Sequence, residues 1–134
     1  MEKERTNDEI NALAYQVRGA IAEVHHVMGP GLMESAYEYA LIRELELRGI
    51  PCQRQVSVPV FYKGVRIKSD YIIDLLVDDC IIIELKSVDY MSSVCHKQLV
   101  TYLKLTGKKL GYLVNFNSND VLARENCVRV VNKF

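Results

Sequence analysis

The chain lacks an excess of either charge, and it has no long apolar run. Its 134 residues include 17 Lys and Arg and 17 Asp and Glu. Bulk positive charge therefore cannot drive binding to nucleic acid, so any such binding has to be local or supported by a partner. No apolar run approaches the roughly 20 residues of a membrane-spanning helix, and the charged segment 1–8 leads into no apolar signal core. We expect a cytoplasmic protein that does not associate with membranes.

The chain also lacks closely spaced cysteines. Its four cysteines, Cys52, Cys80, Cys95 and Cys127, are scattered along the sequence. Their spacing matches neither a zinc ribbon nor the disulfide framework of a small secreted protein, and we interpret them as reduced thiols. A chain of this length with 49% hydrophobic and 25% charged residues can bury its own core. The sequence therefore predicts a single domain over residues 1–134.

Hydrophobic periodicity predicts an α/β fold. Apolar residues recur at helical spacing from Ile10 to Met28, with Asn7 or Asp8 as the expected cap, and the following Gly-Pro-Gly ends that helix. Alternating and continuous apolar runs mark the strands, with a kink or bulge expected near Ser69. The expected order is helix 10–28, helix 32–48, strands 53–62, 65–77 and 80–86, helix 92–105, and strands 110–116 and 127–131.

Three charged side chains interrupt the most apolar part of this pattern. Asp74 is followed after nine residues by Glu84, and Lys86 comes two residues later at the end of a buried strand. Side chains two apart on a strand share a face, and a hairpin can bring Asp74 beside them. Three meandering strands followed by a right-handed helical crossover place all three residues centrally in the sheet.

This trio suits metal-dependent hydrolysis of a phosphodiester. Two carboxylates can bind a hard cation such as Mg²⁺ or Mn²⁺, and a lysine can position the attacking water or stabilise negative charge. A salt bridge between Lys86 and Glu84 or Asp74 is the competing interpretation. Two further motifs accompany the trio: GxxExxY from Gly31 through Glu34 to Tyr37, and QxxxY from Gln98 to Tyr102.

The three motifs together resemble the PD-(D/E)XK nuclease superfamily, and specifically its small bacterial GxxExxY proteins. The resemblance implies a restriction-endonuclease-like αβββαβ core, here with an added N-terminal helix. It also implies a function, which is metal-dependent phosphodiester hydrolysis of nucleic acid, with DNA favoured over RNA.

By the same resemblance, Asp74, Glu84 and Lys86 are the catalytic residues. The metal ligands, for Mg²⁺ or Mn²⁺, would be Glu34, Asp74, Glu84 and the backbone carbonyl of Leu85. Gln98 and Tyr102 would position the substrate.

Two alternatives stay open at this point. The chain could be a non-catalytic nuclease-fold subunit that binds nucleic acid or regulates a partner, which the zero net charge favours and the intact Asp74, Glu84 and Lys86 oppose. The apolar stripe from Ile10 to Met28 could pack on the sheet or form the seam of a homodimer. The sequence leaves the oligomeric state and any protein partner undetermined.

Overall fold

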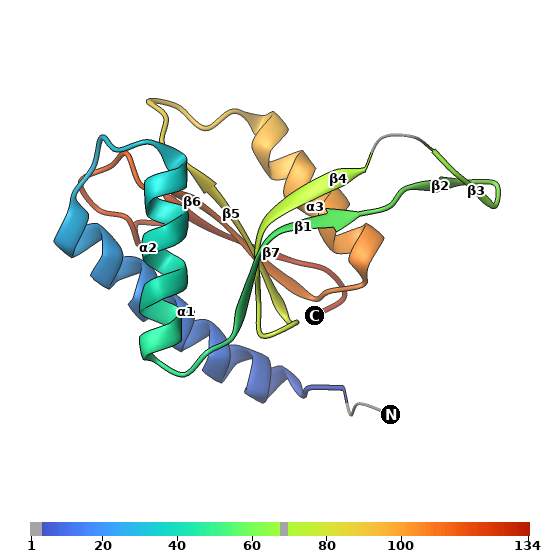
Figure 1. Ribbon diagram of the computed structural model, residues 1–134, viewed down its shortest axis with the longest axis horizontal. Coiled ribbons are helices and arrows are strands. Elements are labelled where there is room, and N and C mark those ends of the chain that lie inside the picture. The colour runs from blue at the N-terminus through green and yellow to red at the C-terminus, as the bar shows by residue number, and fades with distance from the viewer. Residues whose placement is uncertain (1–3, 68–69) are drawn as a thin grey trace.

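The computed structural model describes residues 4–67 and 70–134 and contains ten regular elements (Figure 1). Two helices come first, a third helix crosses over between strands, and the last two strands follow it. The elements are α1 (Asn7–Met28), α2 (Glu34–Leu47), β1 (Cys52–Val58), β2 (Phe61–Tyr62), β3 (Val65–Arg66), β4 (Tyr71–Val77), β5 (Ile81–Lys86), α3 (Ser93–Thr106), β6 (Leu110–Asn115) and β7 (Cys127–Val131).

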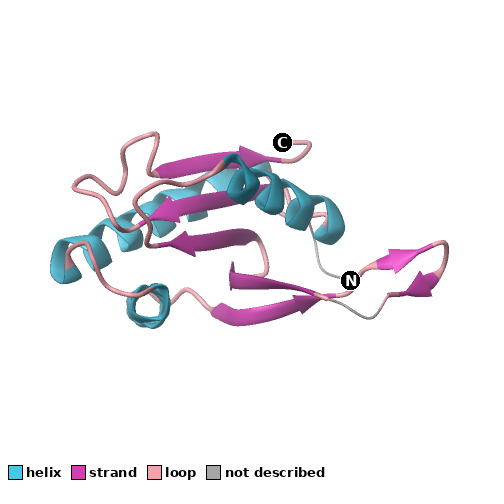
Figure 2. Cartoon of the chain, turned by 90° about the horizontal axis from the view of Figure 1, so that it is seen from above, coloured by secondary structure: helices cyan, strands magenta, loops and turns pink. Residues whose placement is uncertain are grey.

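The main sheet has five strands in the order β1-β4-β5-β6-β7. Strand β5 is therefore the central strand and β4 lies next to it, as expected. Only β5 and β6 run parallel, because α3 connects them as a crossover. Helices α1 and α2 cover one face of the sheet and α3 covers the other (Figures 1 and 2). The predicted α/β architecture is confirmed.

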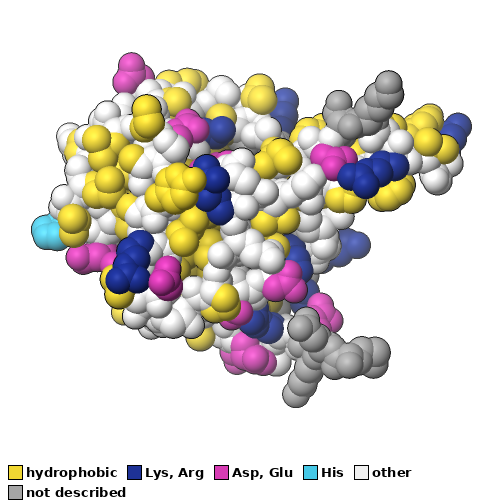
Figure 3. Space-filling view, in the orientation of Figure 1, with side chains coloured by type: hydrophobic (Ala, Val, Ile, Leu, Met, Phe, Trp, Pro, Cys, Tyr) yellow, Lys and Arg dark blue, Asp and Glu magenta, His cyan; other side chains and the backbone are white. Residues whose placement is uncertain are grey.

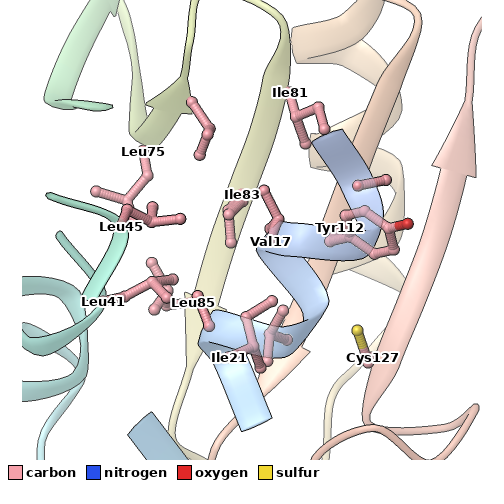
Figure 4. Packing of buried hydrophobic residues seen from close by; sticks show 14 of the residues in the cluster. Val17, Ile21, Leu41, Leu45, Leu75, Ile81, Ile83, Leu85, Tyr112 and Cys127 are labelled. Atoms are coloured by element: carbon pink, nitrogen blue, oxygen red, sulfur yellow. The ribbon is translucent and has the colours of Figure 1, made fainter. Parts of the chain in front are cut away.

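Strand β5 divides its side chains between the two faces of the sheet. Ile81, Ile83 and Leu85 belong to the core under α1 and α2, where Figure 4 shows them beside Val17, Ile21, Leu41 and Leu45. Ile82 instead packs with Leu99 and Leu103 of α3. The alternation of the strand therefore points Glu84 and Lys86 toward α3.

The ends of the helices depart slightly from expectation. Thr6, rather than Asn7 or Asp8, caps α1, because its side chain accepts from the Glu9 N–H while the Glu9 carboxylate accepts from the Thr6 N–H. The predicted stops are correct: Gly29 caps the end of α1 and Gly107 caps the end of α3, both with positive φ. None of the helices in the described residues is long and apolar enough to span a membrane.

The expected long hairpin is divided into two ribbons. Strand β1 pairs with β4 up to Val58, and β2 and β3 form a separate small sheet beyond it. Pro59, which has no N–H to donate, follows the last β1 residue and interrupts the ladder. The turn at Lys63 and Gly64 is where it was predicted, whereas the kink expected at Ser69 lies outside the described residues.

Tyr37 of α2 holds the Gly-Pro-Gly loop in place. Its hydroxyl donates to the Gly29 carbonyl at 2.5 Å and accepts from the Leu32 N–H at 3.1 Å. Its ring is fully buried and stacks on Phe116 with centroids 4.5 Å apart. The Ser87 hydroxyl donates to the Leu32 carbonyl at 2.5 Å. The start of α2 is thereby fixed beside the carboxyl end of β5.

We predict that Tyr37→Phe lowers the free energy of unfolding by about 1–2 kcal/mol, because the ring can remain while both hydroxyl hydrogen bonds are lost and the partly buried Gly29 carbonyl loses its donor. Urea unfolding measures this change. Tyr15→Phe is the matched control, since Tyr15 is 76% exposed on α1 and should lose no more than about 0.5 kcal/mol. Equal losses for the two variants would contradict the assigned role of Tyr37.

Candidate metal and active site

The site begins where β4 separates from β5. Backbone pairing between the two strands runs from Val77↔Ile81 to Leu75↔Ile83 and stops before Asp74 and Glu84, the next pair in register. From that point on, side-chain carboxylates accept the hydrogen bonds of the backbone N–H groups in place of backbone carbonyls. The Asp74 N–H donates to Oε1 of Glu84 at 3.2 Å, and the Leu85 N–H donates to Oδ2 of Asp74 at 2.9 Å. Each carboxylate is thus fixed by the backbone of the opposite strand.

Burial and proximity make this pair electrostatically costly. Glu84 is only 3% exposed. Its pKa is raised from an ordinary 4.5 to about 9, first because burial disfavours the charged form and next because the Asp74 carboxylate lies beside it. Asp74 and the buried Glu84 therefore form a pair of adjacent carboxyl groups with a strongly perturbed pKa, which is typical of functional sites.

Leu85 and Lys86 complete the strand end. The N–H and C=O of a strand residue point to the same side, so the Leu85 carbonyl points toward the gap next to Asp74, as its N–H does. Lys86 is half-buried on the same face as Glu84, and its positive charge favours the charged form of that carboxylate. The backbone carbonyl of Lys86 accepts from the Phe116 N–H at 2.9 Å, which anchors the end of β5 to β6.

The QxxxY motif on α3 faces this carboxylate pair. Tyr102 is buried, and its pKa is raised to about 12 by burial and then by the nearby charges of Glu84 and Asp74. Its ring also meets Tyr71 edge-on with centroids 5.6 Å apart. Gln98 lies one turn earlier on the same face of α3 and is half-buried. The structure therefore brings the QxxxY helix face to the Asp74 and Glu84 pair.

Glu34 is placed differently from the other two acidic residues. It is the first residue of α2, as expected, and its side chain is exposed. The bond between Ser87 and the Leu32 carbonyl holds the start of α2 near the end of β5. Among residues 4–67 and 70–134, however, no three His, Cys, Asp or Glu side chains converge in a way that could hold a metal ion. The structure joins Asp74 to Glu84 and leaves Glu34 outside that pair.

Sequence reasoning missed a second buried acid, Glu38, which is 5% exposed on α2. Its Oε1 accepts from Nε of Arg54 at 2.7 Å and from Nε2 of Gln55 at 2.9 Å. Gln55 lies opposite Asp74 in the β1–β4 register and has a φ of 54°, a conformation that non-glycine residues adopt rarely. The sequence carried a signal for this burial. Glu38 lies one helical turn after Glu34, and it stands between Tyr37 and Leu41, which both belong to the core.

Asn115 is the second functional neighbour that sequence reasoning missed. This side chain is 5% exposed at the end of β6, where it pairs in register with Lys86. Its Oδ1 accepts from the N–H groups of Val88 and Asn117, and its Nδ2 donates to the Val88 carbonyl at 2.9 Å. Asn115 thereby fixes the loop that follows β5.

The donor set fits a hard divalent cation. Asp74 and Glu84 lie close enough for their carboxyl groups to share a proton, so a cation between them would replace that proton and offset the repulsion. Mg²⁺ and Mn²⁺ prefer oxygen ligands, and Mg²⁺ commonly takes only one or two carboxylates and keeps several waters. Two carboxylates and a strand carbonyl meet that requirement without a third acidic side chain.

An α/β sandwich with a carboxylate pair and a lysine at the end of its central strands defines a nuclease-like class of fold. A family profile described as the PD-(D/E)XK nuclease superfamily matches residues 11–130. The chain belongs to that superfamily. No curated protein and no solved structure gives a significant match to the chain. The predicted superfamily and fold are therefore confirmed, and the narrower GxxExxY group stays a prediction.

We predict that Glu84→Gln stabilises the metal-free protein at pH 8. The folded state holds a proton on Glu84 up to about pH 9, whereas the unfolded chain releases it near 4.5, so stability falls as pH rises through this window. A neutral glutamine removes that decline, and we expect a gain of at least about 1 kcal/mol at pH 8 and little gain at pH 5.

Urea unfolding in EDTA at both pH values measures the difference. Glu125→Gln is the matched control, because Glu125 is exposed in the loop before β7 and should change stability equally little at pH 5 and pH 8. A Glu84→Gln protein that is destabilised by the same amount at both pH values would contradict the raised pKa assigned to Glu84.

Proposed function

We propose that this protein hydrolyses phosphodiester bonds of nucleic acid, DNA in preference to RNA, with Mg²⁺ or Mn²⁺ at the Asp74 and Glu84 pair. The observation that carries the proposal is the reciprocal bonding of these carboxylates to the two backbones where β4 leaves β5. A buried carboxyl group beside a second carboxylate costs stability, and such pairs are found most often at functional sites, so membership of a nuclease superfamily supports this use of the pair.

Asp74, Glu84 and the Leu85 carbonyl would hold one metal ion, which when bound lowers the pKa of a coordinated water and offsets the charge of the phosphate. The backbone bonds to Asp74 and Glu84 keep both carboxylates oriented before substrate arrives. The Lys86 ammonium, on the same face, would position the attacking water or donate to the phosphate oxygen as negative charge develops.

Three further residues have supporting roles in this proposal. Gln98 would donate to or accept from the substrate at the mouth of the site, and the Tyr102 hydroxyl would stay protonated as a hydrogen-bond donor beside it. Glu34 would act through water at the site's edge, which its exposed position at the start of α2 favours over direct ligation.

The narrower assignments follow from the motifs. GxxExxY, D-x9-ExK and QxxxY together support membership of the bacterial GxxExxY group, acting as one nuclease-like domain over residues 1–134. All four cysteines are free thiols, which supports a reducing, cytoplasmic setting. A homodimer or a protein partner would help a chain without net charge to hold a long substrate.

One observation favours a second function. Glu34 is exposed, and the described residues contain no group of three acidic side chains that could hold metal. This arrangement suits a nuclease-fold subunit that binds nucleic acid or regulates a partner without cutting. The complete Asp74, Glu84 and Lys86 set makes hydrolysis the stronger of the two proposals.

Cleavage of single-stranded and duplex DNA and RNA with Mn²⁺ separates the two. We expect Glu84→Ala and Lys86→Ala to lower the cleavage rate by about 100-fold or more, because each removes a group that acts on the reacting phosphate or water. Lys133→Ala, near the chain's C-terminal end and outside the site, is the matched lysine control and should cleave as wild type does.

If wild type cleaves no substrate faster than Glu84→Ala or Lys86→Ala, the nuclease assignment fails and the non-catalytic subunit takes its place. Addition of EDTA should abolish wild-type cleavage, and added Mn²⁺ should restore it. Cleavage that continues in EDTA would remove the proposed role of the metal.

A further inference from the structure

A two-stranded arm, which we call the wing (residues 59–67), projects from the edge of the main sheet (Figures 1 and 2). It contains β2 and β3 and turns at Lys63 and Gly64, both with positive φ as a tight hairpin requires. The strand-to-strand pairs Phe61↔Arg66 and Tyr62↔Val65 hold it together. None of the residues assigned to the candidate site lies in the wing.

The wing starts from the part of the sheet that carries the candidate site. It leaves β1 after Val58 and returns to β4, which begins at Tyr71, three residues before Asp74. Tyr71 packs on Tyr102, which faces the carboxylate pair. The base of the wing is therefore attached to the ribbon that forms one side of the site.

The surface of the wing is apolar and basic at once. Phe61, Tyr62 and Val65 are 61%, 66% and 66% exposed. Aromatic side chains exposed to this degree bury little of their apolar area within the fold, which points to a contact with another molecule. Figure 3 shows this projecting end with hydrophobic and basic side chains together.

The charge of the wing favours a polyanion. Residues 59–67 include Lys63 and Arg66 but no acidic residue, in a chain that has 17 basic and 17 acidic residues in all. Arg54 is engaged by Glu38, and Arg66 binds Asp70 through one nitrogen at 2.6 Å while its side chain stays 58% exposed. Lys63 lies 5.4 Å over the Tyr62 ring and has no acidic partner among the described residues.

The shape of the wing favours a duplex over a single strand. Lys63 lies five positions after Val58, so at ~3.3 Å per residue the tip extends up to about 17 Å beyond the sheet. The major groove of B-DNA is about 12 Å wide and about 8.5 Å deep, and it admits a two-stranded ribbon. Single strands are instead held in grooves of the protein, and the wing is a protrusion.

We propose that the wing enters a groove of duplex nucleic acid next to the phosphodiester that the site cuts, with Tyr62 against the groove wall and Lys63 on a backbone phosphate. The choice of partner rests on the proposed nuclease function. The proposal adds to that function a dedicated duplex-binding element in a chain without bulk positive charge.

Binding in EDTA tests the wing without cleavage. The probe is a fluorescent duplex of about three helical turns, ~30 base pairs, with a single strand of equal length beside it, and anisotropy gives Kd at several salt concentrations. We expect Tyr62→Ala to weaken duplex binding about five- to tenfold. Lys63→Ala should also make the slope of log K against log[salt] shallower by about 0.9, as expected for one lost phosphate contact.

Two controls match these changes away from the wing. Tyr15→Ala truncates an exposed tyrosine on α1, and Arg124→Ala removes an exposed cation in the loop between β6 and β7. Both should bind the duplex within twofold of wild type. All of the substitutions are at exposed positions, and unchanged thermal midpoints will show that each variant is folded.

Several results would overturn the proposal. These are a wild type with no duplex affinity, wing variants that bind the duplex as wild type does, or an equal loss for duplex and single strand. A wing that instead makes a dimer, with duplex binding unaffected, also overturns it.

Failure of the wing and failure of the nuclease proposal are distinguishable. If wild type cuts nothing but loses duplex affinity when the wing is changed, duplex binding by the wing stands and the nuclease proposal fails. If wild type cuts duplex DNA and the wing variants bind and cut it equally well, the reverse holds.

Discussion

The structure depends on one local arrangement, in which two carboxylates replace the backbone ladder where β4 leaves β5. Asp74 and Glu84 each bond to the main chain of the opposite strand, so the strands can separate without leaving both N–H groups unpaired. The cost is that Glu84 can ionise only against its burial and the neighbouring Asp74 carboxylate, which raise its pKa to about 9. A divalent cation bound between them would offset that cost, which links the stability of this region to its proposed chemistry.

The apolar core and two buried polar side chains hold the Asp74 and Glu84 pair in position. The apolar core under α1 and α2 fixes the face of β5 that carries Ile83 and Leu85, so Glu84 must point toward α3. Tyr37 and Asn115 hold the two loops that border the end of β5, and both do so through main-chain groups. Such rigid support is what a site needs if its groups are to meet a phosphate in the correct geometry.

Much of the fold followed from the sequence because its signals are local. Helical periodicity, the glycine stops and the continuous apolar run of β5 each depend on neighbouring residues, and the strand pairing that unites Asp74 with Glu84 follows from one short turn. What was missed depends on distant contacts. Glu38 is paired by Arg54 and Gln55, which reach it from β1, and the exposure of Glu34 is set by how α2 docks rather than by its motif. The separate wing required knowing where the β1 ladder breaks.

The central claim is that Asp74 and Glu84 form a metal site, and calorimetric titration with Mn²⁺ tests it most directly. Wild type should bind Mn²⁺, and Asp74→Asn should weaken binding at least about tenfold, since it removes a charged oxygen ligand. Asp79→Asn, in the turn at the other end of the same hairpin, should bind as wild type does. An Asp74→Asn protein that titrates with Mn²⁺ as wild type does would contradict the account.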